Sequence, residues 1–386
     1  MALWKLSLLL LSSGATAFSI QSPPASSAPP LPRIDRVQNL AFRAPLLEYG
    51  YRPAVEEYRN GTLQEKPLLL YLPGFDGSFL SAFLQFPELH TVFDVRTLTI
   101  AADDRSSFDD LRREVLEYLA SQRQRQEIYL AGESFGGILA ASVAASSPRI
   151  DGLTLINAAT CYDRSALAAK GPSVAAAAAW WYPLALATSL GPLFADEYSI
   201  QQLLLILQAE ALPSVIDDAV REAYMGRVAF SLPWVVPQMP QETLQWRLQE
   251  WLEVGCAREI DWKRLQSIPT LIVAAERDRT LPSIDEAERL GMRLPQAVVR
   301  VVEGAGHAST CGSRADLAAW MKGAFGLPGR TERKEGTDGK GEWLGMEPRY
   351  DGASIGLNPL RYWSKKYYER MDPEDLAKET KTIRSP

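Results

Sequence analysis

Residues 127–137 read Glu-Ile-Tyr-Leu-Ala-Gly-Glu-Ser-Phe-Gly-Gly, and this stretch decides the fold of the chain. It opens with a mostly apolar run typical of a buried strand, and small residues typical of a helix follow Gly137. Between the two, Gly132, Ser134 and Gly136 form a G-x-S-x-G motif, which between a strand and a helix is a nucleophile elbow. Side chains in place of these glycines would clash with the neighbouring strand and helix. We therefore predict Ser134 as a nucleophile; a serine in a tight structural turn is the alternative.

Further short apolar runs on both sides of this motif also have the composition of strands. They are residues 67–72, 95–100, 153–157, 269–275 and 298–302. Continuous Leu, Ile and Val runs are typical of parallel strands that are covered on both faces. Capping-type starts, a serine with an acid three positions on, predict helices over 108–121, 284–293 and 314–325. This alternation predicts an α/β fold with a mostly parallel, doubly wound sheet.

One long segment interrupts the alternation, between the strand that ends near Asn157 and the strand that starts at Pro269. A structureless loop of that length is not expected inside a compact domain, so we predict a helical lid insertion over 158–265. Within it, residues 171–195 carry no charged side chain, and three prolines favour broken helices over one membrane span. We expect an apolar lid or a membrane-contacting cap. Buried structural helices and a true span are the alternatives.

A nucleophilic serine needs a base, and the base needs an acid that orients it. The chain has two histidines, His90 and His307. His307 follows the last predicted strand, where its loop would reach Ser134, so we predict it as the base and His90 as a surface or packing residue. For the acid we predict Asp278, on the turn after the strand 269–275, with Glu276 as the alternative.

The oxyanion of an acyl transfer reaction needs two backbone N–H donors. We predict Phe135, the residue after the nucleophile, as one donor. The second is predicted in the Gly-rich loop after the first strand of the sheet, at Phe75. This loop could also be only a tight connection. Asp76 would then hold it by hydrogen bonds within the loop.

The composition bounds the classes of function. The chain has 386 residues and a formal net charge of −6, with 46% hydrophobic and 23% charged residues, as in globular proteins. The acidic balance argues against bulk nucleic-acid binding, which needs a basic face. Cys161, Cys256 and Cys311 form no C-x-x-C motif, so neither a zinc ribbon nor a dense disulfide framework is expected. No metal motif, nucleotide loop or dinucleotide fingerprint is readable, and we predict no cofactor.

The N-terminal residues are typical of a targeting leader. Residues 1–17 have the lysine, apolar run and small residues of a signal peptide, with a buried helix as the alternative. Residues 18–40 form a transit-type segment and linker. They resemble the bipartite leaders of algae in which a phenylalanine, here Phe18, follows the cleavage site. On that resemblance we predict a plastid protein; plain secretion, with Asn60 as a glycan acceptor, is the alternative.

The hydrolase-like body is predicted over residues 41–327, and the chain changes character after it. Residues 328–386 begin with a Gly-rich, charged linker and continue as a tail that is dense in Trp and Tyr. We expect this tail to pack on its own domain, with binding to a partner as the alternative.

The motifs taken together resemble the plastid esterase/lipase/thioesterase family of the α/β-hydrolase superfamily, which includes plant phytyl ester synthases. The matching segments, in chain order, are residues 71–77, 93–96, 104–108, 128–137, 155–159 and 269–273. The resemblance implies an α/β-hydrolase fold with Ser134, Asp278 and His307 as catalytic triad. It also implies lipid acyl esters as substrates, with galactolipids, acyl thioesters, diacylglycerol and phytol among the acyl donors and acceptors.

The chain departs from plant phytyl ester synthases, which resemble a fusion of this hydrolase half with an acyltransferase-like half carrying an H-x4-D motif. No histidine follows His307 here, and Val95 stands five residues after His90. We therefore expect any acyl transfer to come from the triad alone.

The sequence thus predicts a serine lipase or esterase that acts on lipid acyl esters through an acyl-enzyme. An acyltransferase that makes fatty acid phytyl esters or acylglycerols with the same triad is the main alternative. A chlorophyll dephytylase and a non-catalytic scaffold are further ones. The expected partners are the lipid substrate and, through the lid, a membrane surface.

Overall fold

The computed structural model describes residues 40–48, 51–52, 56–59, 62–194, 197–201, 239–312, 314–327 and 342–343. The predicted signal peptide, nearly all of the transit-type segment, Asn60 and most of the C-terminal tail lie outside the described residues. Of the tail, Glu342–Trp343 form strand β11, which pairs antiparallel with β2 (Tyr51–Arg52). The placement of the leader and the tail stays a prediction.

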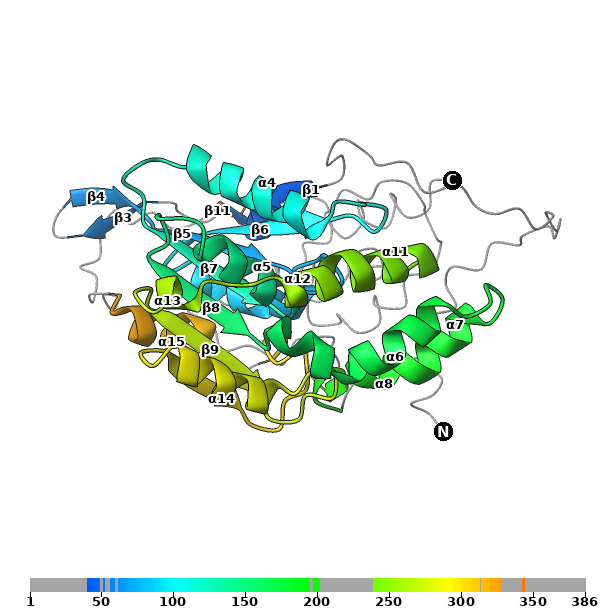
Figure 1. Ribbon diagram of the computed structural model, residues 1–386. Helices are drawn as coiled ribbons and strands as arrows, with labels where there is room; N and C mark the ends of the chain where they lie inside the picture. Colours follow the sequence, from blue (N-terminus) through cyan, green and yellow to red (C-terminus); the bar gives the residue numbers. More distant parts are fainter. Residues whose placement is uncertain are drawn as a thin grey trace, which may run out of the picture. The chain divides into compact units, whose positions relative to one another are not determined.

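A seven-stranded sheet with the order β1-β6-β5-β7-β8-β9-β10 organises the fold (Figure 1). Its strands are β1 (Leu40–Arg43), β5 (Leu68–Leu72), β6 (Asp94–Ile100), β7 (Ile128–Glu133), β8 (Gly152–Ile156), β9 (Thr270–Ala275) and β10 (Val298–Val302). All neighbours pair in parallel except β1, which is antiparallel to β6. Every predicted strand is therefore confirmed to within two residues, and so is the mostly parallel sheet. Strand β1 was not predicted. A separate hairpin joins β3 (Glu56–Arg59) and β4 (Thr62–Glu65).

Both faces of the sheet are buried along β5, β7, β8 and β9, as their continuous apolar runs require. The edge strand β10 differs, since Val299 and Val301 are 39% and 47% exposed, so the prediction of a buried strand over 298–302 is wrong in its burial. In β5, Leu68, Leu70 and Leu72 belong to one hydrophobic cluster, whereas Leu69 and Tyr71 belong to another. Side chains of successive strand residues point to opposite faces, so these two clusters are the two sides of the sheet. The unbroken Leu run is explained by burial on both sides.

Helices cover the two faces in separate groups. One cluster takes residues from α4 (Phe108–Ser121), α5 (Phe135–Ala144) and α14 (Ser283–Arg293). The other takes residues from η1 (Leu80–Gln85), α3 (Phe86–Leu89) and α15 (Leu317–Phe325). A short helix, α2 (Pro45–Glu48), follows β1. These two layers on one sheet confirm the doubly wound prediction.

One of the three predicted helix starts is confirmed and two are corrected. The Ser107 side chain and the Asp110 side chain form the expected capping box of α4. In α14 the predicted capping box is wrong: no side chain caps this helix, because the Ser283 hydroxyl donates to Asp278 instead. Helix α15 starts at Leu317 rather than at 314, because Asp316 accepts the backbone N–H of Ala319 and caps the helix there.

The long segment between β8 and β9 is helical where it is described. Its elements are η2 (Ala159–Arg164), α6 (Ala166–Ala175), α7 (Tyr182–Ala185), η3 (Leu186–Leu190), α8 (Gly191–Phe194), α11 (Gln241–Trp246), η4 (Arg247–Glu253), α12 (Val254–Ala257) and α13 (Trp262–Leu265). Figure 1 shows α6, α7, α8 and α11 grouped beyond one end of the sheet. None of the described helices has the length and apolar character that a membrane crossing requires. The helices of the charge-free stretch are short and interrupted, as its prolines predict. Its limits as a lid stay a prediction.

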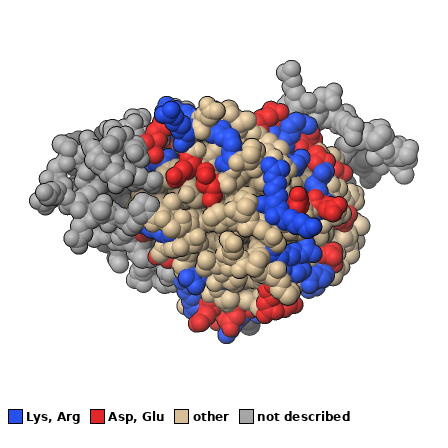
Figure 2. Space-filling view, turned by 60° about the vertical axis from the view of Figure 1, so that its left-hand side comes forward, with Lys and Arg blue, Asp and Glu red and all other residues tan. Residues whose placement is uncertain are grey.

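The charged side chains are mixed by sign on the face shown in Figure 2. Lys and Arg side chains alternate there with Asp and Glu side chains around an uncharged area. The formal net charge of −6 is therefore not gathered into one acidic patch on this face.

The close approach of β5 to the start of α5 yields a first prediction. A Cβ added at Gly136 would lie 2.2 Å from the carbonyl oxygen of Leu72, whereas a Cβ at Gly323 in α15 would meet no atom within 4 Å. We expect Gly136→Ala to lower the melting temperature by at least several degrees or to abolish folding. We expect the matched Gly323→Ala to raise stability by about 0.5–1 kcal/mol, as alanine does in a helix interior. Thermal unfolding followed by circular dichroism measures both, and an unchanged Gly136→Ala protein would contradict this account.

Candidate active site

Ser134 lies on the sharp turn between β7 and α5. Its backbone has φ 54° and ψ −116°, a region that a residue with a side chain seldom occupies. Three hydrogen bonds hold the turn: Ser134 N–H donates to Ile156 at 2.9 Å, and the Ser134 carbonyl accepts from Gly137 at 3.0 Å and Ala159 at 2.9 Å. A Cβ at Gly132 would lie 2.1 Å from the Gly136 carbonyl oxygen. This is the geometry that the G-x-S-x-G motif predicted.

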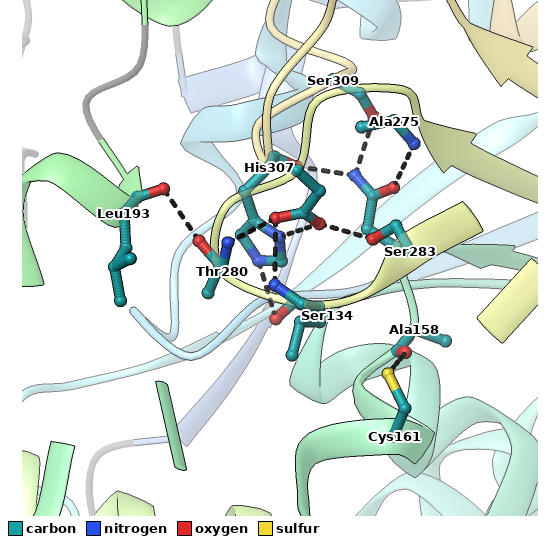
Figure 3. Close-up of polar contacts among 12 residues, drawn as sticks. Ser134, Ala158, Cys161, Leu193, Ala275, Thr280, Ser283, His307 and Ser309 are labelled. Carbon is teal, nitrogen blue, oxygen red and sulfur yellow. Dashed lines mark hydrogen bonds and ion pairs between the residues drawn. The ribbon is translucent and has the colours of Figure 1, made fainter. Parts of the chain in front are cut away.

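His307 joins Ser134 to Asp278 (Figure 3). Its Nε2 lies 3.0 Å from Ser134 Oγ, and its Nδ1 lies 2.8 Å from Asp278 Oδ2. The three residues come from the ends of β7, β9 and β10, and all three side chains are buried. The structure thus brings the three predicted side chains into one hydrogen-bonded row.

Four donors hold the Asp278 carboxylate. Besides His307, the backbone N–H groups of Thr280 and Leu281 donate to Oδ1 at 2.8 and 3.1 Å, and the Ser283 hydroxyl donates to Oδ2. Burial by itself raises the pKa of the Asp278 carboxyl, but the neighbouring His307 and the hydrogen bonds outweigh it, so the pKa lies below its usual value. At neutral pH the carboxylate is therefore ionised and accepts Nδ1–H. Nε2 is then left to accept the Ser134 hydroxyl proton.

The two alternatives from the sequence lie in other environments. Glu276 accepts the backbone N–H of Gly304 at 2.6 Å, so its carboxylate fixes the loop after β10. His90 is buried in the packing at the end of α3, and burial, with Lys66 and Arg96, lowers its pKa to about 3. His90 is thus a neutral packing residue, and its reading as a surface residue is wrong.

Asn157 is a site residue that the sequence reasoning missed. It follows β8 with a positive φ of 43°. Its amide donates to the His307 carbonyl at 2.7 Å and to Ser309 Oγ at 2.9 Å, and its amide oxygen accepts Ala275 N–H at 2.8 Å. Asn157 therefore fastens the loop of His307 to the ends of β8 and β9. An Asn directly after an apolar strand was the available signal.

The two predicted oxyanion residues belong to segments that adjoin Ser134. Phe135 is the first residue of α5, where backbone N–H groups have no partner within the helix. Phe75 follows Gly74, at which an added Cβ would lie 3.7 Å from Ser134 Cβ. The Gly74 carbonyl accepts the Gly77 N–H at 3.0 Å, and the Asp76 carboxylate accepts from the Ser78 hydroxyl, the within-loop contact expected of it.

A second buried acid adjoins the nucleophile. The Glu133 carboxylate accepts hydrogen bonds from the hydroxyls of Tyr71 and Ser81. Burial raises the pKa of Glu133, and this effect exceeds the lowering by the two hydroxyls and by His307. Burial also raises the pKa of Tyr71 well above its usual value, so Tyr71 stays a hydrogen-bond donor. Both donors fix the residue that precedes Ser134.

Helix α8 of the insertion contacts the row formed by Ser134, His307 and Asp278. The Phe194 ring lies 6.0 Å from the His307 ring, centroid to centroid, in an edge-to-face arrangement. The Thr280 hydroxyl donates to the Leu193 carbonyl at 2.9 Å (Figure 3). The insertion therefore contacts both the imidazole and the loop that carries Asp278.

Within the described part of the chain, no group of three or more His, Cys, Asp or Glu side chains is placed to hold a metal ion. Cys161, Cys256 and Cys311 are not joined to one another by disulfide bonds. The arrangement at Ser134 suits proton transfer and nucleophilic attack by a hydroxyl. That the protein works without a cofactor stays a prediction.

Comparison with known proteins identifies the family to which the chain belongs. A family model described as "Alpha/beta hydrolase family" matches residues 69–320. Phytyl ester synthase 1, chloroplastic, from Arabidopsis thaliana is 31% identical over 268 residues, which cover 68% of this chain and 37% of the relative. Phytyl ester synthase 2, chloroplastic, from the same plant is 29% identical over 274 residues, covering 66% and 37%. The chain thus spans little more than a third of the length of these curated relatives.

Solved structures with a similar arrangement are more distant. MenH from S. aureus has a TM-score of 0.48 and 16% sequence identity, covering 75% of this chain and 98% of its own. A bacterial membrane phospholipase A has a TM-score of 0.45 and 18% identity, covering 72% and 88%.

The contacts of Asn157 yield a second prediction. We expect Asn157→Ala to destabilise the protein by about 2 kcal/mol or more, because three hydrogen bonds are lost and the buried Ala275 N–H is left unpaired. Asn157→Gly accepts the positive φ without strain and also lacks the amide, so it separates the two effects. Urea unfolding gives both values. Wild-type stability of Asn157→Gly would mean that the backbone conformation, and not the side chain, is what matters.

Proposed function

Because the chain belongs to the alpha/beta hydrolase family, we propose that it is a serine hydrolase of lipid acyl esters, with Ser134, His307 and Asp278 as its catalytic triad. The observation that carries this proposal is the hydrogen-bonded row in which His307 lies 3.0 Å from Ser134 and 2.8 Å from Asp278. A serine, a neutral imidazole and an ionised carboxylate in that order are what activation of a hydroxyl requires.

The reaction that we propose follows from this row of hydrogen bonds. His307 Nε2 takes the proton of the Ser134 hydroxyl while Oγ attacks the ester carbonyl carbon. The imidazolium that forms is stabilised by Asp278, whose pKa is lowered in the folded protein. The N–H groups of Phe75 and Phe135 stabilise the oxyanion of the tetrahedral intermediate. His307 then gives its proton to the leaving alcohol. Water, deprotonated by the same imidazole, releases the acid from the acyl-enzyme.

The insertion supports a lipid as the substrate. Residues 171–195 carry no charge, and Phe194 faces the imidazole of His307. An apolar segment beside the base would favour a long acyl or prenyl chain over a polar substrate. The curated relatives are named for a phytyl ester, whose alcohol is a long hydrocarbon chain.

Acyl transfer to an alcohol such as phytol is the second function that we consider. The names of the two plant relatives favour it. The acyl-enzyme is the same in both reactions, and only the acceptor that resolves it differs. Exclusion of water by the insertion would favour the alcohol.

On the same names, which specify chloroplastic proteins, we propose a plastid location, for which the leader would supply the targeting signal.

Ser134→Ala is the third prediction. We expect it to remove hydrolysis of long-chain esters and covalent labelling by a fluorophosphonate, because both need the serine oxygen. Release of fatty acid from plastid-type lipids, followed by mass spectrometry, measures the first. Turnover retained by Ser134→Ala would overturn the proposed mechanism.

The same assay separates hydrolysis from transfer when free phytol is added. Fatty acid released with and without phytol, at equal rates, identifies a hydrolase. Fatty acid phytyl esters that form only with phytol, and only with Ser134 present, identify an acyltransferase that uses this triad.

We also propose that α7 brings the protein to a lipid surface. Trp180 and Trp181 adjoin its start, with exposed fractions of 83% and 44%, and their rings pack edge to face at 5.7 Å. Leu184 within α7 is 44% exposed. Tryptophan favours the boundary between water and acyl chains, because its ring is apolar and its N–H remains wet. No charged side chain interrupts this segment.

The fourth prediction tests that surface. We expect Trp180→Ala with Trp181→Ala to weaken binding to phosphatidylcholine vesicles about tenfold or more, since burial of one large side chain contributes about 1.5–3 kcal/mol. Met292→Ala is the matched control, because Met292 is 79% exposed but lies on α14, outside the insertion. Vesicle sedimentation measures the binding. Equal binding by the double variant and the wild type would remove this surface from the proposal.

A further inference from the structure

One helical run of the insertion touches both residues to which the oxyanion donors are assigned. Residues 241–257 form this run, in which α11, η4 and α12 follow one another directly. We propose that Arg247 and Trp251 of this run are positioning residues that hold the two halves of the oxyanion hole. The inference rests on the proposed function and extends it, because it makes the insertion part of the catalytic apparatus.

Arg247 holds the loop of Phe75. Its side chain is buried, with an exposed fraction of 1%. Its Nη1 donates to the Phe75 carbonyl at 2.9 Å, while Nη2 donates to the carbonyls of Ala101 at 2.8 Å and Ile100 at 3.3 Å. The guanidinium thereby joins the loop after β5 to the end of β6. Gly77 leaves room for it, since a Cβ there would lie 3.1 Å from both Nη atoms.

These contacts fix the direction of the Phe75 N–H. The Gly74 carbonyl, which shares a trans peptide plane with that N–H, is held by Gly77 at 3.0 Å. The next peptide plane is held by Arg247 through the Phe75 carbonyl. With the planes on both sides fixed, the N–H of Phe75 cannot rotate. Preorganised donors are what make an oxyanion hole effective.

Trp251 holds the second residue. Its ring stacks on the Phe135 ring with centroids 4.6 Å apart and planes 19° from parallel. The Trp251 ring also contacts Arg247, whose guanidinium carbon lies 4.3 Å from the ring centroid. The indole N–H donates to the Ser106 carbonyl at 2.9 Å, which fixes the ring. Guanidinium, indole and phenyl groups therefore connect Phe75 to Phe135.

The charge of Arg247 is costly where it lies, which argues for a role beyond packing. Burial lowers the pKa of Arg247 to about 10, against the opposing effect of Asp76 and Asp104, so it stays protonated at neutral pH. A methionine or leucine would fill such a site without the desolvation cost of a buried cation. Only a guanidinium, however, can donate to three carbonyl groups at fixed angles.

The test compares Arg247→Met with the wild-type full chain on a long-chain ester. We expect kcat to fall about tenfold to a hundredfold with KM within twofold, because loss of one oxyanion donor costs about a hundredfold to a thousandfold and a misplaced donor costs less. Binding of a long-chain trifluoromethyl ketone, which forms an oxyanion on Ser134, should weaken by the same factor. Binding of the matching ether, which forms none, should stay unchanged. Arg247→Lys should recover part of the loss.

Arg289→Met is the matched control. Arg289 also lies over a tryptophan, 6.0 Å from the Trp262 ring centroid, and donates to buried Glu286 at 2.7 Å. We expect it to lose stability but to keep kcat within about threefold, since it contacts neither oxyanion residue. If Arg247→Met does not fold, Trp251→Leu supplies the second variant, with the same pattern expected at smaller size.

Two results of the kinetic and binding comparison would overturn the inference. One is an equal loss of ketone and ether binding, which indicates general damage to the site. The other is a fall in kcat that matches the unfolded fraction alone. The rate of fluorophosphonate labelling of Ser134 gives an independent reading, because it also passes through a charged oxygen. If the wild type labels but hydrolyses no lipid ester, the proposed substrate fails, and equal labelling of Arg247→Met would then overturn the positioning role separately.

Discussion

The close crossing between β7 and α5 is the constraint on which the rest of the structure depends. A Cβ on Gly132 would lie 2.1 Å from the Gly136 carbonyl oxygen, and a Cβ on Gly136 would lie 2.2 Å from the Leu72 carbonyl oxygen at the end of β5. The chain meets this constraint by turning sharply at Ser134, with φ at 54°. The turn puts a hydroxyl at the end of the sheet and the start of a helix directly behind it. The positions of Ser134 and Phe135 thus both follow from these backbone contacts.

The remaining groups are brought to that hydroxyl by parallel strands that end at the same edge. Strands β9 and β10 deliver Asp278 and His307, and Asn157 after β8 ties their loops together. Asp278, His307 and Ser134 therefore belong to different loops but are supported by the same sheet. The buried Glu133 carboxyl, which accepts hydrogen bonds from two hydroxyls, also holds the residue that precedes Ser134.

The sequence was sufficient for the sheet and the row of three side chains, because local patterns encode both. Apolar runs locate strands, and a glycine pair with a serine between them needs no distant information. Contacts between remote segments that no motif marks were beyond its reach. Ser283 looks like a helix cap, yet its hydroxyl turns to Asp278 because the carboxylate is nearby in space. No motif marks Arg247, and its partner Phe75 lies 172 positions away.

The insertion divides into two parts that would tolerate replacement differently. Residues 166–194 contact the site through apolar and backbone groups of α8, such as Phe194 against the imidazole. Residues 241–257 instead interlock with the loops that follow β5 and β6, through Arg247 and Trp251. An exchange of residues of the insertion for those of a related protein should therefore place its C-terminal junction before Met239. The graft would then exchange the part that contacts His307 and keep the contacts of Arg247 and Trp251.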